Sequence, residues 1–167
     1  MLTVKRLLWT TLLMSLAAPS WAERGVVKFP EQYAEGVRYA VVRRGDIRQQ
    51  IYTSQAAIDA VRSGKPIPSG AVITLVDYRE GRLHRYVVME KRSGWGAAYP
   101  PELRNGDWEY EAFNADRTVN TQDDVGRCFA CHKAQAQRDF VFTLDRMMAG
   151  AFQASPVAGD VVEKRPD

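Results

Sequence analysis

The sequence predicts an α+β protein, built mainly from an antiparallel β-sheet with a short helix and a C-terminal helical segment. Pairs of β-branched and aromatic runs separated by tight turns predict the sheet. A stretch that follows a serine between two such pairs predicts the short helix. C-terminal to the last of these runs the apolar residues recur at helical spacing, and this part of the chain contains a Cys-x-x-Cys-His motif.

Residues 1–22 precede the predicted fold. Lys5 and Arg6 are followed by an uncharged apolar run over 7–18, and Ser20-Trp21-Ala22 has the small-x-small pattern of a cleavage site. The run is too short for a transmembrane span. We therefore expect a secretory signal peptide, with a lone signal anchor as the alternative. Cleavage after Ala22 leaves 145 of the 167 residues, the size of a single domain.

The remaining chain is close to neutral. The first 22 residues contain two basic and no acidic side chains, which leaves 21 basic and 20 acidic residues, a net charge of +1. No basic stripe interleaved with aromatic residues is present. We expect no nucleic-acid partner, and no membrane span after signal cleavage.

The first predicted hairpin joins residues 37–43 to residues 47–53. Both runs are rich in residues that favour strands, and Arg44-Gly45-Asp46 between them is a tight-turn sequence. Ser54 is a good N-cap for a helix over 55–64. The apolar residues of that stretch fall on one helical face, which predicts the side that packs against the core: Ala57, Ile58 and Val61.

A second hairpin is expected from residues 71–78 and 83–91, after a proline-containing loop over 65–70. Residues 93–106 are rich in glycine and proline and predict an irregular segment. Residues 107–113 alternate aromatic and acidic side chains, as in a half-buried strand. We expect the strand carboxylates to lie on the solvated face: Glu90, Glu109 and Glu111.

The chemistry of the chain is concentrated in Cys128-Phe129-Ala130-Cys131-His132, the attachment motif of a c-type haem. Two thiols three positions apart lie on one helical turn and can reach the two vinyl groups of one porphyrin. His132 then provides an axial imidazole for the iron. A structural zinc site needs four ligands, whereas the chain offers two cysteines and two histidines, and His84 is far away. We expect one covalent haem c, anchored by Cys128 and Cys131.

Residues 23–153 form the predicted haem domain. After the motif, apolar residues at helical spacing predict a C-terminal helix with a core-facing side: Phe140, Leu144, Met147, Met148 and Phe152. Residues 154–167 are expected to be a flexible tail. About a hundred residues of the mature chain precede the motif, whereas small helical electron carriers usually have it near the N-terminus.

The mature chain resembles the cytochrome P-460 family, which includes the cytochrome c′-beta proteins. The resemblance covers most of its length and depends on four blocks together: Phe29-Pro30-Glu31-Gln32-Tyr33; residues 64–78; residues 88–96 with Trp108-Glu109-Tyr110; and Cys128 to His132 with Asp139-Phe140-Val141-Phe142-Thr143. The resemblance implies a sheet-rich fold, one c-type haem with His132 as proximal ligand, and possible homodimers.

The resemblance also implies two activities. The P-460 enzymes oxidise hydroxylamine and carry a lysine cross-linked to the haem, whereas the c′-beta relatives lack the cross-link and bind NO and CO. The family's lysine lies five residues past the last glycine of its loop, and counting from Gly70 gives Leu75. Neither Thr74 nor Val76 is a lysine, and Lys65 and Lys91 do not match in position. The departure disfavours hydroxylamine oxidation.

The sixth iron position decides between the remaining functions. If the C-terminal helix is continuous, Met147 rises about 22 Å above His132 and cannot reach the opposite side of the haem. We expect Met147 and Met148 in the core, His84 exposed and Met89 in the core. The prediction is therefore a pentacoordinate iron beneath an apolar cap that includes Leu75 and Ile67.

The sequence thus predicts a periplasmic mono-haem c-type cytochrome that binds NO or similar small ligands. Its compartment follows from the signal peptide and from the motif, because haem is attached to Cys-x-x-Cys-His outside the bacterial cytoplasm. An electron-transfer cytochrome with a redox partner protein is one alternative. A haem oxidoreductase acting on hydroxylamine-like nitrogen species is the other.

Overall fold

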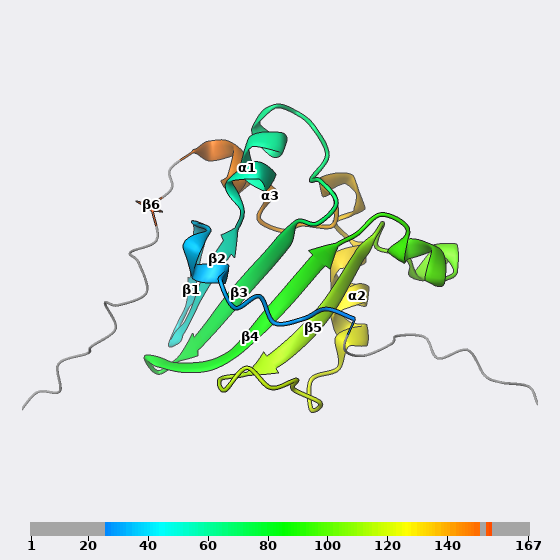
Figure 1. Ribbon diagram of the computed structural model, residues 1–167. Coiled ribbons are helices and arrows are strands. Elements are labelled where there is room, and N and C mark those ends of the chain that lie inside the picture. The colour runs from blue at the N-terminus through cyan, green and yellow to red at the C-terminus, as the bar shows by residue number, and fades with distance from the viewer. Residues whose placement is uncertain (1–25, 151–152, 155–167) are drawn as a thin grey trace, which may run out of the picture.

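A six-stranded antiparallel sheet forms the centre of the computed structural model, with strand order β5-β4-β3-β2-β1-β6 (Figure 1). The structure describes residues 26–150 and 153–154. The predictions for residues 1–22, for Phe152 and for residues 155–167 lie outside these. The strands are β1 (Val37–Arg44), β2 (Ile47–Thr53), β3 (Val72–Arg79), β4 (Arg82–Lys91), β5 (Trp108–Asn114) and β6 (Gln153–Ala154). The helices are α1 (Gln55–Arg62), α2 (Val125–Lys133) and α3 (Leu144–Ala149), and short 3-10 turns include Trp95–Ala98 and Pro101–Leu103.

Both predicted hairpins are confirmed. β1 pairs with β2, and β3 pairs with β4, across tight turns. In the second turn Glu80 has φ +50° and Gly81 has φ +76°, the left-handed pair that matches the twist of the flanking strands. The turn chemistry therefore fixes the register in which the side chains of one face are brought together.

Helix α1 begins where the sequence predicts it. The Ser54 side chain accepts a hydrogen bond of 3.2 Å from the Ala57 amide, so one free N–H of the first turn is satisfied. Ala57, Ile58 and Val61 are buried, as the helical pattern indicates. Helix α1 contacts α3, and the two helices cover one end of the sheet (Figure 1).

The two faces of the sheet are covered by different parts of the chain. Figure 1 shows α2 on one side of the sheet and the N-terminal segment crossing the other side. Ile51, Ile73 and Met89 belong to the cluster on the first face, together with residues of α1 and α3. The second face packs against the N-terminal segment, and its cluster contains Val27, Tyr52, Val76, Tyr86, Val88 and Phe113.

The prediction of solvated strand carboxylates is wrong. Glu90 and Glu109 are each 7% exposed, and Glu111 is 1% exposed. The burial has a tertiary cause, because the N-terminal segment and the irregular segment after β4 fold over this side of β4 and β5. Glu109 is stabilised there by a hydrogen bond of 2.9 Å from the Tyr99 hydroxyl.

The C-terminal helical pattern is divided rather than continuous. Helix α2 ends at Lys133 and α3 begins only at Leu144, and between them Asp139 and Phe140 have positive φ angles. Met147 is fully buried, as predicted, but Met148 is 56% exposed, so its assignment to the core is wrong. A helix of six residues has room for only a narrow buried side.

Candidate haem site

Helix α2 holds the two thiols on one turn. Its first turn is capped by Asp124, whose carboxylate accepts a hydrogen bond of 2.9 Å from the Gly126 amide. Cys128 is half-buried, Cys131 is exposed, and both are free thiols. Burial raises the pKa of Cys128, so the group is a thiol rather than a thiolate at neutral pH. Because neither thiol forms a disulfide, both sulfurs are available for thioether bonds.

His132 is fixed in the tautomer that an iron ligand requires. Its Nδ1 donates a hydrogen bond of 2.6 Å to the main-chain carbonyl of Phe140, which leaves Nε2 with the free lone pair. The ring packs between Tyr110 and Phe142, with centroid distances of 4.9 Å and 5.0 Å. Burial lowers the pKa of His132, although the hydrogen bond to Phe140 opposes the shift, so the imidazole is neutral at pH 7.

An apolar cavity of about 120 Å³ lies beside His132. Strands β2, β3 and β4 supply half of its lining residues, and the others come from β5, α2 and the segment before α3: Ile51, Ile73, Leu75, Val87, Met89, Tyr110, His132, Val141, Phe142 and Thr143. The Thr143 hydroxyl shares a hydrogen bond of 2.8 Å with the Tyr39 hydroxyl. The lining that β2, β3 and β4 contribute is entirely apolar, and the polar lining atoms include the hydroxyls of Tyr110 and Thr143.

The structure brings some of the predicted site residues together and separates others. Leu75 and His132 line the same cavity, together with the buried Met89. Ile67 is buried in the same hydrophobic cluster but is not part of the cavity wall, and its amide donates to Asp139 at 3.2 Å. His84 is exposed, as expected.

Neither of the two lysines nearest to the cross-linking position lines the cavity. Lys65 is exposed. Lys91 is half-buried, and its Nζ contacts both carboxylate oxygens of Asp139, at 2.9 Å and 2.7 Å. Leu75 therefore remains the residue that the sheet presents at this place.

A polar row borders the apolar wall on the same face of the sheet. Strand register places Gln49, Asp77, Arg85 and Asn114 side by side, two residues along the strands from the row that contains Leu75. Asp77 is fully buried beside Arg85, with 3.5 Å between its Oδ2 and the arginine Nε. Arg85 also contacts Asp123 at 2.5 Å, just before α2. Sequence reasoning missed this row, although an aspartate within the apolar run 71–78 is its one local signal.

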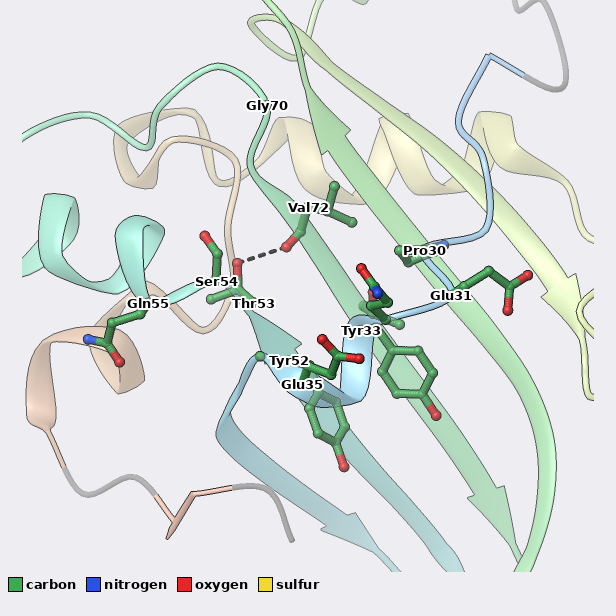
Figure 2. A pocket seen from close by; sticks show the side chains of 13 residues that line it. Pro30, Glu31, Tyr33, Glu35, Tyr52, Thr53, Ser54, Gln55, Gly70 and Val72 are labelled. Atoms are coloured by element: carbon green, nitrogen blue, oxygen red, sulfur yellow. Dashed lines mark hydrogen bonds between the residues drawn. The ribbon is translucent and has the colours of Figure 1, made fainter. Parts of the chain in front are cut away.

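A larger hollow of about 670 Å³ lies on the opposite face of the sheet (Figure 2). Tyr33, Tyr52 and Val72 line it, and the Thr53 hydroxyl donates to the Val72 carbonyl at 2.8 Å (Figure 2). Its lining contains neither a thiol nor an imidazole. The donor set of a haem therefore belongs to the first face, with α2.

The donor atoms of the first face fit those that hold a c-type haem. Two free thiols occupy one turn of α2, the adjacent histidine keeps Nε2 free, and an apolar cavity opens beside that histidine. Fold and site together define the class of a haem-binding cytochrome built on an antiparallel sheet.

Comparison with known families agrees with this class. The Cytochrome P460 family model matches residues 30–143, which include β1 to β5 and the whole Cys-x-x-Cys-His motif. The chain belongs to the cytochrome P460 family. A comparison with curated proteins finds no match to this chain. Among the described residues, no helix has both the length and the apolar character needed to cross a membrane.

Proposed function

We propose that the protein is a periplasmic mono-haem c-type cytochrome that binds NO or a similar small, uncharged ligand. Cys128 and Cys131 would hold the haem through thioethers, and His132 Nε2 would bind its iron. The apolar cavity that Leu75 shares with His132 is the observation that carries the proposal. When bound, the haem iron supplies a centre that binds diatomic molecules and exchanges single electrons.

The protein's own residues prepare this site in two ways. Burial keeps His132 neutral, so a proton competes less with the iron for Nε2. The apolar side chains of β2, β3 and β4 disfavour charged ligands, because an anion would lose its hydration against a wall that offers no donor. The arrangement favours NO or CO over anionic ligands.

Met89 supports one alternative function. Its side chain lines the cavity that contains His132, and a methionine thioether is a known axial haem ligand. Met89 ligation would make the protein an electron-transfer cytochrome that exchanges electrons with a partner protein. A haem oxidoreductase acting on hydroxylamine-like species is the weaker alternative, because Leu75 stands where the resemblance places the cross-linking lysine.

The proposal is tested by narrowing the cavity. Leu75→Phe adds bulk to the cavity wall, whereas Leu83→Phe makes the same change on β4 among residues of the second face. We expect the rate of NO binding to the ferrous protein, followed by stopped-flow absorption, to fall at least several-fold in Leu75→Phe. Leu83→Phe should bind NO at the wild-type rate. Equal NO binding rates in wild type and Leu75→Phe would contradict a ligand site beside Leu75.

A further inference from the structure

Asp139 links its own segment, between α2 and α3, to three other segments that are distant in the sequence. Its carboxylate accepts from Lys91 Nζ at the end of β4 and, at 3.3 Å, from Trp108 Nε1 at the start of β5. It also accepts, at 3.2 Å, from the Ile67 amide in the loop before β3. The side chain is 24% exposed and that of Lys91 is 15% exposed, so the ion pair is largely shielded from water. The carboxylate therefore fixes the chain at residue 139 to the end of the sheet.

The backbone at this point has an unfavourable conformation. Asp139 has φ +49° and ψ +36°, and Phe140 follows with φ +60°. Two successive left-handed residues with side chains are uncommon and need support from their surroundings. The Phe140 ring lies against Gly106, where an added Cβ would come within 3.1 Å of the ring. Main-chain hydrogen bonds from Phe140 N to Gln135 O (2.9 Å) and from Val141 N to Arg138 O (3.0 Å) close the turn, and the Asp139 carboxylate and the Gly106 contact hold the pair against the sheet.

The left-handed pair determines where the carbonyl oxygen of Phe140 points. The Phe140 carbonyl, directly after Asp139, accepts the 2.6 Å hydrogen bond from His132 Nδ1. A hydrogen bond from Nδ1 makes an axial imidazole a stronger donor to iron and fixes the ring orientation. Any release of Asp139 would allow residues 139–140 to relax toward the right-handed region and would turn this carbonyl away from the imidazole.

We infer that Asp139 is a positioning residue, which acts through the Phe140 carbonyl to tune the bond between His132 and the haem iron. The inference rests on the proposed attachment of haem through His132. This role differs from ligand binding, because Asp139 would influence the reduction potential of the haem from the proximal side. Lys91 and Trp108 are partners in this role, since both hold the same carboxylate.

The test separates positioning from simple electrostatics. In the haem-loaded protein, Asp139→Ala removes a negative charge, Lys91→Met removes a positive charge, and Trp108→Phe changes no charge. Charge alone would raise the midpoint potential in Asp139→Ala, lower it in Lys91→Met and leave it unchanged in Trp108→Phe. Positioning predicts that all three variants raise the potential, because each weakens the hydrogen bond that stabilises ferric iron.

Two further readouts and a control complete the experiment. The Fe–His stretching band of the ferrous protein should move to lower frequency in all three variants. Asp139→Gly removes the same charge as Asp139→Ala but permits the left-handed backbone, so it should shift the potential less. Asp59→Ala, on the exposed side of α1, should leave both readouts at wild-type values.

A lower potential in Lys91→Met together with an unchanged potential in Trp108→Phe would overturn the inference. If Asp139→Ala does not load haem, the signs of the midpoint-potential shifts in Lys91→Met and Trp108→Phe still test the positioning role of Asp139. The midpoint potential is measurable whether or not a sixth ligand is present. A low-spin ferrous wild type would therefore contradict the open site proposed above, whereas the potentials of the variants would still test Asp139.

Discussion

His132 and Phe140 are joined by a hydrogen bond of 2.6 Å between the imidazole Nδ1 and the main-chain carbonyl. The two residues lie eight positions apart, and the chain reaches this geometry only by leaving α2 and passing through two left-handed residues. The bond selects the tautomer in which Nε2 is free. A haem cytochrome needs this arrangement on its proximal side before any ligand binds.

Removing both thiols should abolish covalent attachment. In a Cys128→Ser/Cys131→Ser double variant, any haem that remains is held only by His132 and by packing. We expect acid acetone to extract the haem from this variant, whereas wild-type protein should retain it, and the intact mass should show one haem only in the wild type. Haem that resists extraction from the double variant would place the covalent attachment elsewhere.

The stability of the haem-free protein, in which no iron occupies Nε2, should depend on pH through His132. Because burial lowers its pKa in the folded state, the unfolded chain binds the proton more readily, near pH 6.5. Stability should therefore be constant above this pH and fall below it, by at most about 1.4 kcal/mol per pH unit for this group. Urea unfolding of wild type and His132→Asn between pH 8 and pH 5 measures the difference. Parallel curves for the two proteins would contradict the assignment.

The contribution of Glu109 to stability should change with pH in the opposite direction. Burial raises its pKa, although the hydrogen bond from Tyr99 opposes the shift, so the folded state disfavours its charged form. Its contribution to stability should therefore decline as pH rises above the ordinary carboxyl pKa of about 4.3. Glu109→Gln, which retains an acceptor for Tyr99, should raise the free energy of unfolding at pH 7 by on the order of 1 kcal/mol. The gain should vanish near pH 4, and a gain that is independent of pH would point to another cause.

The Asp77–Arg85 ion pair should affect the stability of the protein mainly when one of its partners is removed. Arg85→Met would leave the fully buried Asp77 carboxylate with the more exposed Arg79, 3.5 Å away, as its remaining cationic partner, so the loss should be at most about the 3 kcal/mol typical of a broken buried pair. The Asp77→Asn/Arg85→Met double variant should recover part of the loss, because no buried charge remains. Chemical denaturation of the three proteins gives the comparison. A double variant less stable than Arg85→Met would contradict this explanation.

The sequence predicts those parts of the fold that local chemistry determines. Gly45 and Gly81 mark the two hairpin turns, and Ser54 marks the start of α1, because turns and caps need particular residues at particular positions. The motif of α2 is equally local. In each of these cases a few adjacent residues contain the whole physical requirement.

The remaining features depend on tertiary contacts that no local pattern contains. Glu111 has the alternation of a solvated strand position, yet segments distant in sequence cover it. Of the left-handed pair, Asp139 belongs to a residue type that is enriched in this region, but Phe140 does not, so the sequence does not signal two successive left-handed residues. The apolar residues after the motif keep helical spacing across this pair, which is why the pattern predicts one helix with Met148 on its core-facing side.

The ferrous absorption spectrum before and after addition of NO tests the central claim most directly. An open site beside His132 predicts a broad, high-spin ferrous Soret band that shifts when NO is added, with the same behaviour in Met89→Leu. Sharp low-spin bands that do not respond to NO, and that become high-spin in Met89→Leu, would contradict it. That result would identify Met89 as the sixth ligand and the protein as an electron carrier.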